Sequence, residues 1–247
     1  MKHEVERIRH DIRRRTLTVR QIERITPGMA RIVLEGAELE GFVSLSPDDH
    51  VKLFFPIPGS DDAEKRDYTP RRHDATAGTL TIDFALHDPA HAGPATRWAL
   101  SAKPGDTLQF GGPKGSMVVP LDYDWWLLAG DETALPSIGR RLEEMPSGTR
   151  VTSIIMVTGP GEEQRFDTRA AHRSVWVHRP AEQAADPAPL LQALKQEKPG
   201  QGEGFIWIGA EAKVAAAAKE FLTQTWKHDP AWMKAKGYWM TGHASDD

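Results

Sequence analysis

Residues 50–56 read His-Val-Lys-Leu-Phe-Phe-Pro, and this stretch predicts a β-strand with one buried face. Successive side chains of a strand point to opposite faces of its sheet. Val51, Leu53 and Phe55 therefore share one face, and His50, Lys52 and Phe54 share the other. We expect the first set to line a core, which directs Lys52 away from it.

Stretches of the same kind lie on both sides of this strand and are separated by glycine and proline. They cover residues 17–25, 30–35, 79–87 and 107–111. Short strands at this spacing predict an antiparallel β-barrel in the N-terminal part of the chain. The basic run Arg13, Arg14 and Arg15 precedes them, and we interpret it as a solvated strand face.

The pattern changes after Pro120, where apolar runs alternate with stretches typical of helices. The predicted strands cover residues 125–130, 150–158, 174–178 and 205–208, and the predicted helices cover residues 133–145, 187–196 and 211–225. This alternation predicts an α/β domain with a mostly parallel sheet. We expect residues 1–122 and 123–247 to form two domains, joined by a linker at residues 121–124.

Length, charge and composition exclude several classes of function. A chain of 247 residues suits two modest domains. The 31 basic and 35 acidic residues give a net charge of −4, so the overall electrostatic field of the protein does not attract nucleic acid or an anionic membrane. Cysteine is absent, which excludes disulfides, thiolate nucleophiles and cysteine-ligated iron–sulfur clusters. Any electron transfer would need an organic cofactor. No signal-peptide or membrane-spanning pattern is present, and we expect a cytoplasmic protein.

Residues 66–71, Arg-Asp-Tyr-Thr-Pro-Arg, bring a cation, an aromatic ring and a hydroxyl onto one short extended segment. This combination suits a flavin dinucleotide. The Arg66 guanidinium can bind a pyrophosphate, while Tyr68 and Thr69 can contact the isoalloxazine and ribityl groups. The alternative for these six residues is a surface turn that ends at Pro70.

A helix is predicted to begin at Pro94, after a loop that starts near His87. The free amides of Ala95 and Thr96 would lie at the positive end of the helix dipole, where a pyrophosphate can bind. Strand alternation also puts Asp83 and His87 on one face, so both could point to a cofactor. The alternatives are an ordinary helix with Trp98 in the core, and a structural role for His87.

Five motifs follow one another along nearly the whole chain. They are residues 66–71, 93–98 (Gly-Pro-Ala-Thr-Arg-Trp), 111–116 (Gly-Gly-Pro-Lys-Gly-Ser), 130–136 (Gly-Asp-Glu-Thr-Ala-Leu-Pro) and 237–239 (Gly-Tyr-Trp). In this order they resemble the siderophore-interacting protein family, which contains FAD-dependent ferric-siderophore reductases related to ferredoxin-NADP reductase. The resemblance implies an FAD-binding barrel followed by a domain of the NAD(P)H-binding type, whose C-terminal segment returns to the flavin.

The resemblance also implies a set of site residues. FAD would contact Arg66, Asp67, Tyr68, Thr69, Asp83, His87, Gly93, Ala95, Thr96, Asp131, Thr133 and Trp239. An anionic ferric siderophore would be attracted by Lys52, Lys114 and Lys234, with Lys236 as a rival for Lys234. Core packing is the alternative for Trp239, and plain surface exposure is the alternative for each lysine. No metal site is indicated by the spacing of the histidines.

The electron donor is left open between NADPH, NADH and ferredoxin. The related reductases have a glycine-rich turn after the first strand of the second domain, whereas here Asp131 and Glu132 follow Gly130. Asp131 is predicted to cap the next helix. The resemblance suggests that any nicotinamide would lie near Thr158, Gly159 and Glu211.

We expect a monomeric enzyme that passes electrons through FAD to the Fe(III)-siderophore and uses no catalytic side chain. The alternatives are a general NAD(P)H:flavin reductase with a protein or small-molecule acceptor, and a non-enzymatic siderophore-binding or flavin-sensing module.

Overall fold

The computed structural model describes residues 3–57, 59–60, 62–86 and 92–242. The chain divides into two compact units, of which the first ends at Val119 and the second begins at Pro120. His87, a predicted cofactor contact, lies outside the described residues. None of the helices in the described ranges is long and apolar enough to cross a bilayer.

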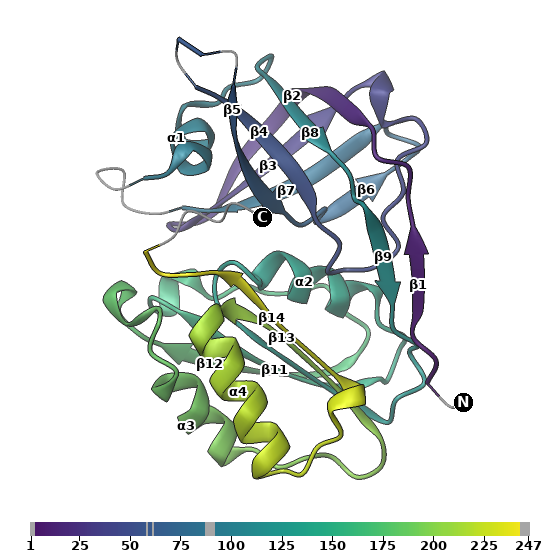
Figure 1. The fold of residues 1–247 in the computed structure, drawn as a ribbon, viewed down its shortest axis with the longest axis vertical. Helices are drawn as coiled ribbons and strands as arrows, with labels where there is room; N and C mark the ends of the chain where they lie inside the picture. Colours follow the sequence, from purple (N-terminus) through teal and green to yellow (C-terminus); the bar gives the residue numbers. More distant parts are fainter. Residues whose placement is uncertain (1–2, 58, 61, 87–91, 243–247) are drawn as a thin grey trace. The chain divides into compact units, whose positions relative to one another are not determined.

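The first unit is built from antiparallel strands (Figure 1). A seven-stranded sheet has the order β5-β4-β8-β2-β3-β7-β6, and β1 pairs separately with β9. The bounds are β1 Glu6–Arg9, β2 Arg14–Thr26, β3 Met29–Glu35, β4 Val51–Pro56, β5 Ala63–Tyr68, β6 Arg72–Asp74, β7 Thr79–Ala85, β8 Thr107–Gly111 and β9 Gly115–Val118. The predicted antiparallel β fold is confirmed.

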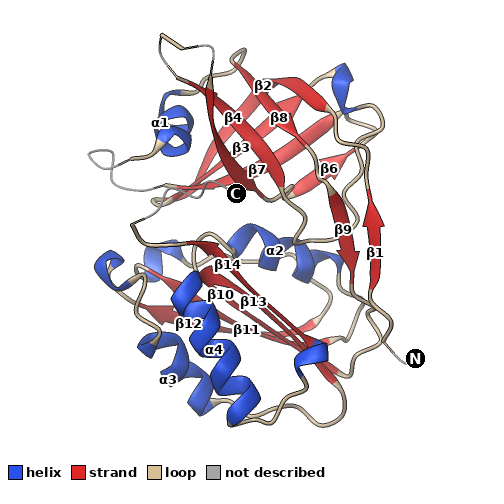
Figure 2. Cartoon of the chain, viewed as in Figure 1, coloured by secondary structure: helices blue, strands red, loops and turns tan. Residues whose placement is uncertain are grey.

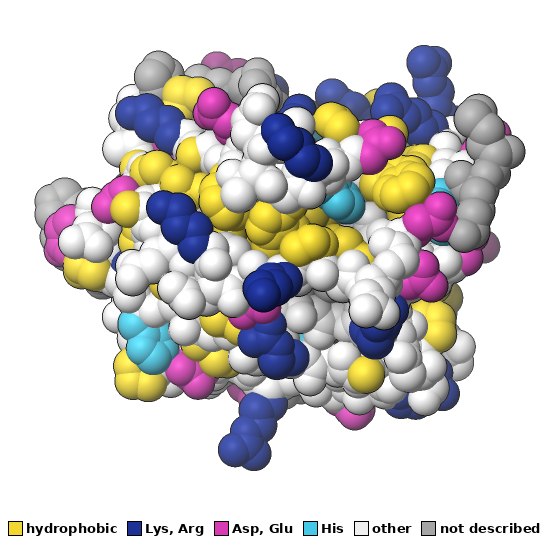
Figure 3. Space-filling model, turned by 90° about the horizontal axis from the view of Figure 1, so that it is seen from below, with side chains coloured by type: hydrophobic (Ala, Val, Ile, Leu, Met, Phe, Trp, Pro, Cys, Tyr) yellow, Lys and Arg dark blue, Asp and Glu magenta, His cyan; other side chains and the backbone are white. Residues whose placement is uncertain are grey.

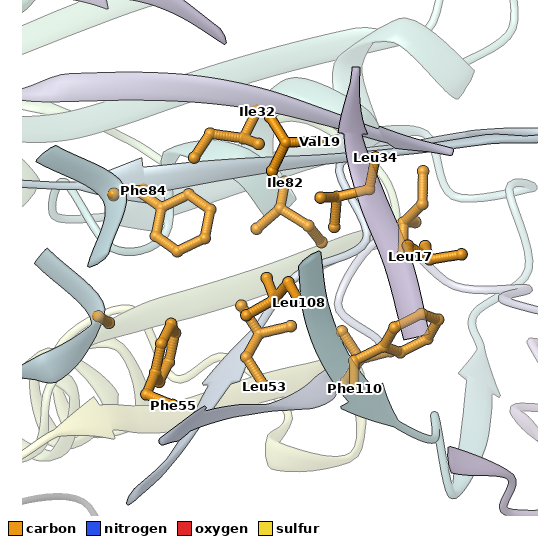
Figure 4. Packing of buried hydrophobic residues seen from close by; sticks show 14 of the residues in the cluster. Leu17, Val19, Ile32, Leu34, Leu53, Phe55, Ile82, Phe84, Leu108 and Phe110 are labelled. Carbon is orange, nitrogen blue, oxygen red and sulfur yellow. The ribbon is translucent and has the colours of Figure 1, made fainter. Parts of the chain in front are cut away.

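Inward-pointing side chains from five of these strands and from helix α1 form one core (Figure 4). The alternation predicted for β4 is confirmed, since Val51, Leu53 and Phe55 are at most 2% exposed. Lys52 and Phe54 lie on the opposite face and are half-buried. Each large apolar side chain buried in this way contributes about 1.5–3 kcal/mol to folding, so the alternation fixes which face of the sheet is inside.

Helix α1, Pro94–Ser101, begins at the predicted proline and covers the edge of this core. Ala95 and Ala99 belong to the core cluster, and the Trp98 ring packs 6.0 Å from Phe55 and 5.6 Å from Phe84, measured between centroids. The helix is therefore held by its inward face, and Gly93, the residue before its first turn, is exposed.

The second unit has a five-stranded sheet in the order β12-β11-β10-β13-β14, and every neighbouring pair is parallel (Figure 2). The strands are β10 Trp125–Gly130, β11 Arg150–Val157, β12 Ala171–His178, β13 Gly204–Glu211 and β14 Met233–Trp239; the helices are α2 Leu135–Glu144, α3 Ala188–Gln196 and α4 Ala212–Gln224. Helices α3 and α4 cover one face of the sheet and α2 covers the other. The α/β prediction is confirmed.

One detail of the predicted α/β pattern is wrong. Helix α2 begins at Leu135 and has Ala134 in the cap position, so Asp131 is not its N-cap. The connection from β11 to β12, for which no helix was predicted, contains the short 3₁₀-helix Pro160–Glu162 followed by a segment without regular secondary structure. The aromatic ring of Phe166 covers β12 there in place of a helix, 6.5 Å from Trp176 and 6.0 Å from His172.

Polar strands escaped the prediction because they lack a clear alternation of apolar residues. Strand β1 reads Glu-Arg-Ile-Arg and β6 reads Arg-His-Asp, and pairing with β9 and β7 makes them strands. The solvated face predicted for residues 13–15 is right for Arg13 and Arg14 and wrong for Arg15. Arg15 is 5% exposed and donates from Nε to the carbonyl oxygen of Glu38 at 2.8 Å.

The surface carries both signs of charge. Figure 3 shows one face on which hydrophobic side chains are interspersed with basic and acidic ones. This agrees with the small net charge of −4 and with attraction of anions by local clusters only.

Candidate functional site

Strand β5 and the residues after it present the predicted flavin contacts at an edge of the barrel sheet. Arg66 donates to the carbonyl oxygen of Lys65 at 2.7 Å and to Oε2 of Glu64 at 3.1 Å, and its side chain is 18% exposed. A guanidinium has five N–H donors, so these two bonds orient Arg66 and leave donors for an anion. Thr69, the predicted hydroxyl contact, is buried.

The Tyr68 ring connects this strand to helix α1. Its centroid lies 4.5 Å from that of Phe84, which in turn packs against Trp98 of α1 at 5.6 Å. Burial raises the pKa of Tyr68 above its usual value, against a smaller opposing effect of Arg66. Tyr68 therefore keeps its phenolic proton and can donate a hydrogen bond at any physiological pH.

The first turn of α1 is open to an anion. Gly93 is the N-cap residue, no described side chain accepts a bond from the amides of the first turn, and Pro94 occupies the first position. No described atom lies within 4 Å of the position that a Cβ on Gly93 would take. Unsatisfied amides, a positive dipole end and free space are what a pyrophosphate requires. Together with Arg66 and Tyr68, this turn fits FAD.

Asp83, predicted to face the cofactor, has both carboxylate oxygens engaged by arginines of the first unit. Arg31 donates from Nε and Nη2 to its two oxygens at 2.7 Å each, and Nε of Arg71 lies 3.6 Å from Oδ2. The Asp83 side chain is 2% exposed and that of Arg71 is 6% exposed. Asp83 thus anchors Arg71, the last residue of the 66–71 segment.

Two of the three lysines predicted to attract the chelate lie in the first unit. Nζ of Lys52 is 3.2 Å from Oδ1 of Asp67, so Asp67 partly neutralises this lysine. Lys114 is exposed in the turn between β8 and β9, and its carbonyl accepts a hydrogen bond from the His10 amide at 3.1 Å. Lys234 belongs to the second unit, on β14 opposite Trp207 of β13.

Asp131 binds several parts of the second unit together at the end of β10. It is fully buried; Oδ1 accepts from the amide and hydroxyl of Thr133 at 2.9 and 2.5 Å, and Oδ2 accepts from the Glu211 amide and from Nε1 of Trp239, each at 2.9 Å. The carboxylate therefore fixes the positions of Thr133 and Trp239, two other predicted flavin contacts.

Glu211 and Tyr238 complete this arrangement. The side chain of Glu211 is fully buried and caps α4 by accepting from the amides of Lys213 and Val214 at 2.6 and 3.3 Å. The Tyr238 hydroxyl lies 3.0 Å from Oγ of Ser137 on α2. The Glu211 side chain is thus engaged in a helix cap.

A buried ion pair lies after the ends of β10 and β12. Nη2 of Arg179, whose side chain is 2% exposed, donates to Oε2 of Glu132 at 2.7 Å. Burial raises the pKa of Glu132, although Arg179 opposes this shift. The pair explains why an acidic residue is tolerated directly after Asp131.

The described residues contain no cluster of three or more histidine and acidic side chains that could hold a metal ion. Two cavities in the second unit, of about 320 and 600 Å³, are lined by described residues that do not include the predicted site residues. The larger one lies beside Phe166, His172 and Trp176, where β12 lacks a covering helix.

The family comparisons define the class of the protein as an FAD-binding one. Residues 18–65 and 57–117 match the model of the siderophore-interacting FAD-binding domain, and residues 123–242 match that of the siderophore-interacting proteins. The chain belongs to the siderophore-interacting protein family, as its motifs indicated.

Individual relatives agree with this assignment. An NADPH-dependent ferric-chelate reductase of Escherichia coli (strain K12) is 35% identical over 95% of this chain and 96% of its own length. A ferric vibriobactin reductase of Vibrio cholerae is 28% identical over 98% and 93%. The crystal structure of a siderophore utilization protein from T. fusca superposes with a TM-score of 0.91 at 36% identity, covering 99% of both chains.

Sequence reasoning missed Arg31 as a partner of Asp83 and missed the capping role of Glu211. A signal for the first existed, because Arg31 and Asp83 lie on predicted strands; their pairing follows only from the β3–β7 register. No local signal marked Glu211, whose role depends on a strand and a helix meeting at that residue.

Proposed function

We propose that this protein is an FAD-dependent ferric-siderophore reductase that passes electrons from NADPH to the Fe(III) of an anionic siderophore. The observation that supports it most is the open first turn of α1, joined to the Arg66–Thr69 segment through Phe84, in a domain of the FAD-binding family. The names of the similar reductases from Escherichia coli and Vibrio cholerae point to the same reaction.

The residues of the first unit bind and orient the cofactor. The amides of Ala95 and Thr96 and the Arg66 guanidinium hold its pyrophosphate, while Gly93 leaves the space for it. Tyr68 and Thr69 contact the isoalloxazine and ribityl groups, with Asp67 beside them. When bound, FAD accepts an electron pair from a reduced nicotinamide and donates single electrons to an acceptor.

In the second unit, Asp131 acts by positioning Thr133 and Trp239 for the flavin. Asp131 itself accepts four hydrogen bonds, so its oxygens are already engaged within the protein. NADPH is the proposed donor because the relative of 35% identity is named for it; NADH and ferredoxin are the donors to compare. We further propose a monomeric, cytoplasmic protein.

The substrate is bound by charge. Lys52, Lys114 and Lys234 attract the anionic chelate, and lysine suits a bulky anion because it needs no fixed geometry. Hard oxygen ligands hold ferric iron far more tightly than ferrous iron, so reduction releases the metal. No side chain has to transfer a proton, and electrostatic positioning carries the rate.

The test combines an FAD-binding assay with measurements of the rate of Fe(II) formation for several electron donors and ferric chelates. Purified protein is expected to bind FAD, and under anaerobic conditions to form Fe(II) captured by a ferrous-specific chelator. NADPH, NADH and reduced ferredoxin are compared as donors against catecholate, hydroxamate and citrate complexes of Fe(III). Rapid NADPH-driven reduction of a siderophore complex supports the proposal; a protein that binds no FAD, or that reduces free flavin only, contradicts it.

A further inference from the structure

Gly111 of β8 lies between two cations on the outer face of the barrel sheet. Arg14 of β2 is its partner on one side and Lys52 of β4 its partner on the other (Figure 1). Residues paired across antiparallel strands point to the same face. Because Leu17, Leu53 and Phe110 point into the core, Arg14 and Lys52 point outward over a residue that has no side chain.

The next row of the same face adds an aromatic ring and a third cation. Phe54 pairs with Gln109 on one side and with Lys65 on the other. The guanidinium carbon of Arg14 lies 4.2 Å from the Phe54 ring centroid, and the ring edge lies 3.5 Å from the position that a Cβ on Gly111 would take. The ring thus packs over the glycine, and Arg14 stacks on the ring.

These cations differ in how far they are neutralised. Lys52 pairs with Asp67 at 3.2 Å. Arg14 is exposed and forms no ion pair with any residue in the described part of the chain. Arg14, Lys52 and Lys65 against the single carboxylate of Asp67 leave these two rows with a net charge of +2. Arg14 and Lys65 are therefore the exposed cations of these two rows whose charges are uncompensated, and Arg14 is the one that stacks on the Phe54 ring.

We propose that Arg14, with Phe54, is a specificity-determining contact that favours iron chelates whose ligand groups are aryl oxyanions, such as catecholates. A planar guanidinium already stacked on a ring offers its free face to a second aromatic group and its N–H edge to an anionic oxygen. A neutral hydroxamate chelate without aromatic groups offers neither. The inference rests on the proposed reductase function and extends it to the substrate class.

Binding is tested first, with a chelate that cannot be reduced. The Ga(III) tris-catecholate complex is titrated into the FAD-loaded wild-type protein and the variants Arg14→Ala, Arg14→Lys and Phe54→Leu, and Kd is measured by calorimetry. We expect Arg14→Ala to raise Kd about five- to tenfold, Arg14→Lys to restore part of the affinity through its charge, and Phe54→Leu to raise Kd about two- to fivefold. Arg24→Ala, which removes an exposed arginine of the same strand, should leave Kd unchanged.

Rates then give the specificity. For Arg14→Ala we expect the KM of the ferric tris-catecholate to rise by a similar factor, with kcat nearly unchanged and with the KM of a neutral ferric trihydroxamate unaffected. Equal changes for both chelates, or no change in Kd and KM, would overturn the inference while the wild-type rates still support the reductase function. A wild-type protein that binds the gallium complex through Arg14 without reducing the iron complex would overturn only the reductase function. FAD content and thermal unfolding of each variant show whether it is folded.

Discussion

Asp83 on β7 and Asp131 just after β10 are both buried acids, and each is stabilised inside the protein by different partners. Asp83 is compensated by the charges of Arg31 and Arg71, whereas Asp131 accepts four hydrogen bonds from two amides, a hydroxyl and an indole. A buried carboxylate is tolerated only when its lone pairs are satisfied in one of these ways. Each residue therefore positions neighbours from the 66–71 segment or from the C-terminal strand.

Removal of Asp83 should be strongly destabilising. Asp83→Ala removes the carboxylate that pairs with the Arg31 and Arg71 guanidinium groups, and the Arg71 side chain is only 6% exposed, so we expect the free energy of unfolding to fall by about 3–5 kcal/mol. Urea denaturation measures the change. The matched control is Arg20→Ala, which breaks the exposed Arg20–Glu35 pair and should cost less than about 1 kcal/mol. Similar losses for the two variants would contradict this account of the buried pair.

At the scale of elements, α1 has a buried face and a first turn whose amides no capping side chain binds. Trp98, Ala95 and Ala99 hold it against β4 and β7, which gives the helix its stability through packing. A free-standing helix of this length would be marginal in water. Tertiary packing thus allows the N-terminal amides to stay without a capping side chain, available to a ligand.

Filling the cap position should separate helix stability from flavin binding. Gly93 has φ −70° and ψ 176°, an extended conformation that aspartate adopts readily at an N-cap, so Gly93→Asp should stabilise the flavin-free protein by about 0.2–0.5 kcal/mol. The same carboxylate would repel the pyrophosphate, and we expect the Kd for FAD to rise at least about tenfold. Thermal unfolding without FAD and a fluorescence titration with FAD measure the two effects.

Gly93→Ala serves as the control, because it adds a Cβ without a charge. Its effect on the Kd for FAD should be much smaller than that of the aspartate. Unchanged FAD affinity in Gly93→Asp would remove the first turn of α1 from the cofactor site.

At the scale of the whole molecule, each unit has its own sheet, and each has a core of its own. Two partly buried histidines, His172 and His228, belong to the second unit. Burial lowers the pKa of both below its usual value, and for His228 the bond to the Trp232 carbonyl and the charge of Asp229 oppose the shift. The folded second unit therefore binds protons less readily than the unfolded chain at these positions.

This difference predicts a loss of stability in mild acid. A histidine whose pKa is lowered by folding contributes stability that is present above its usual pKa of 6.5 and is lost as the pH falls below that value. We expect the free energy of unfolding to decrease from pH 7 to pH 5.5, and the double variant His172→Gln/His228→Gln to show a shallower decrease.

Comparison of the two proteins at pH 8 removes the effect of the lost contacts, such as the 2.8 Å bond between His172 and Ser153. Urea denaturation at each pH provides the measurement. Parallel pH profiles for the wild type and the double variant would show that other groups govern the acid sensitivity.

Most of the fold followed from local patterns. Strand alternation at residues 50–56 identified the inner face of β4, and the change of rhythm after Pro120 separated an antiparallel unit from a parallel one. The start of α2 was predicted less well, because an aspartate near a helix start is typical of an N-cap, whereas here Asp131 lies before the cap residue Ala134.

The sequence alone determined which residues are chemically suited to a flavin and an anionic chelate, because side-chain type and strand period are local properties. Only the tertiary structure decided their partners, because pairing depends on the register between strands far apart in the chain. Asp83 pairs with Arg31 and Arg71, and Asp131 accepts hydrogen bonds from Thr133 and Trp239. Lys52 and Arg14 lie on either side of Gly111. Burial makes these contacts important for stability, because a charge removed from water is stabilised only by the polar neighbours that the fold places beside it.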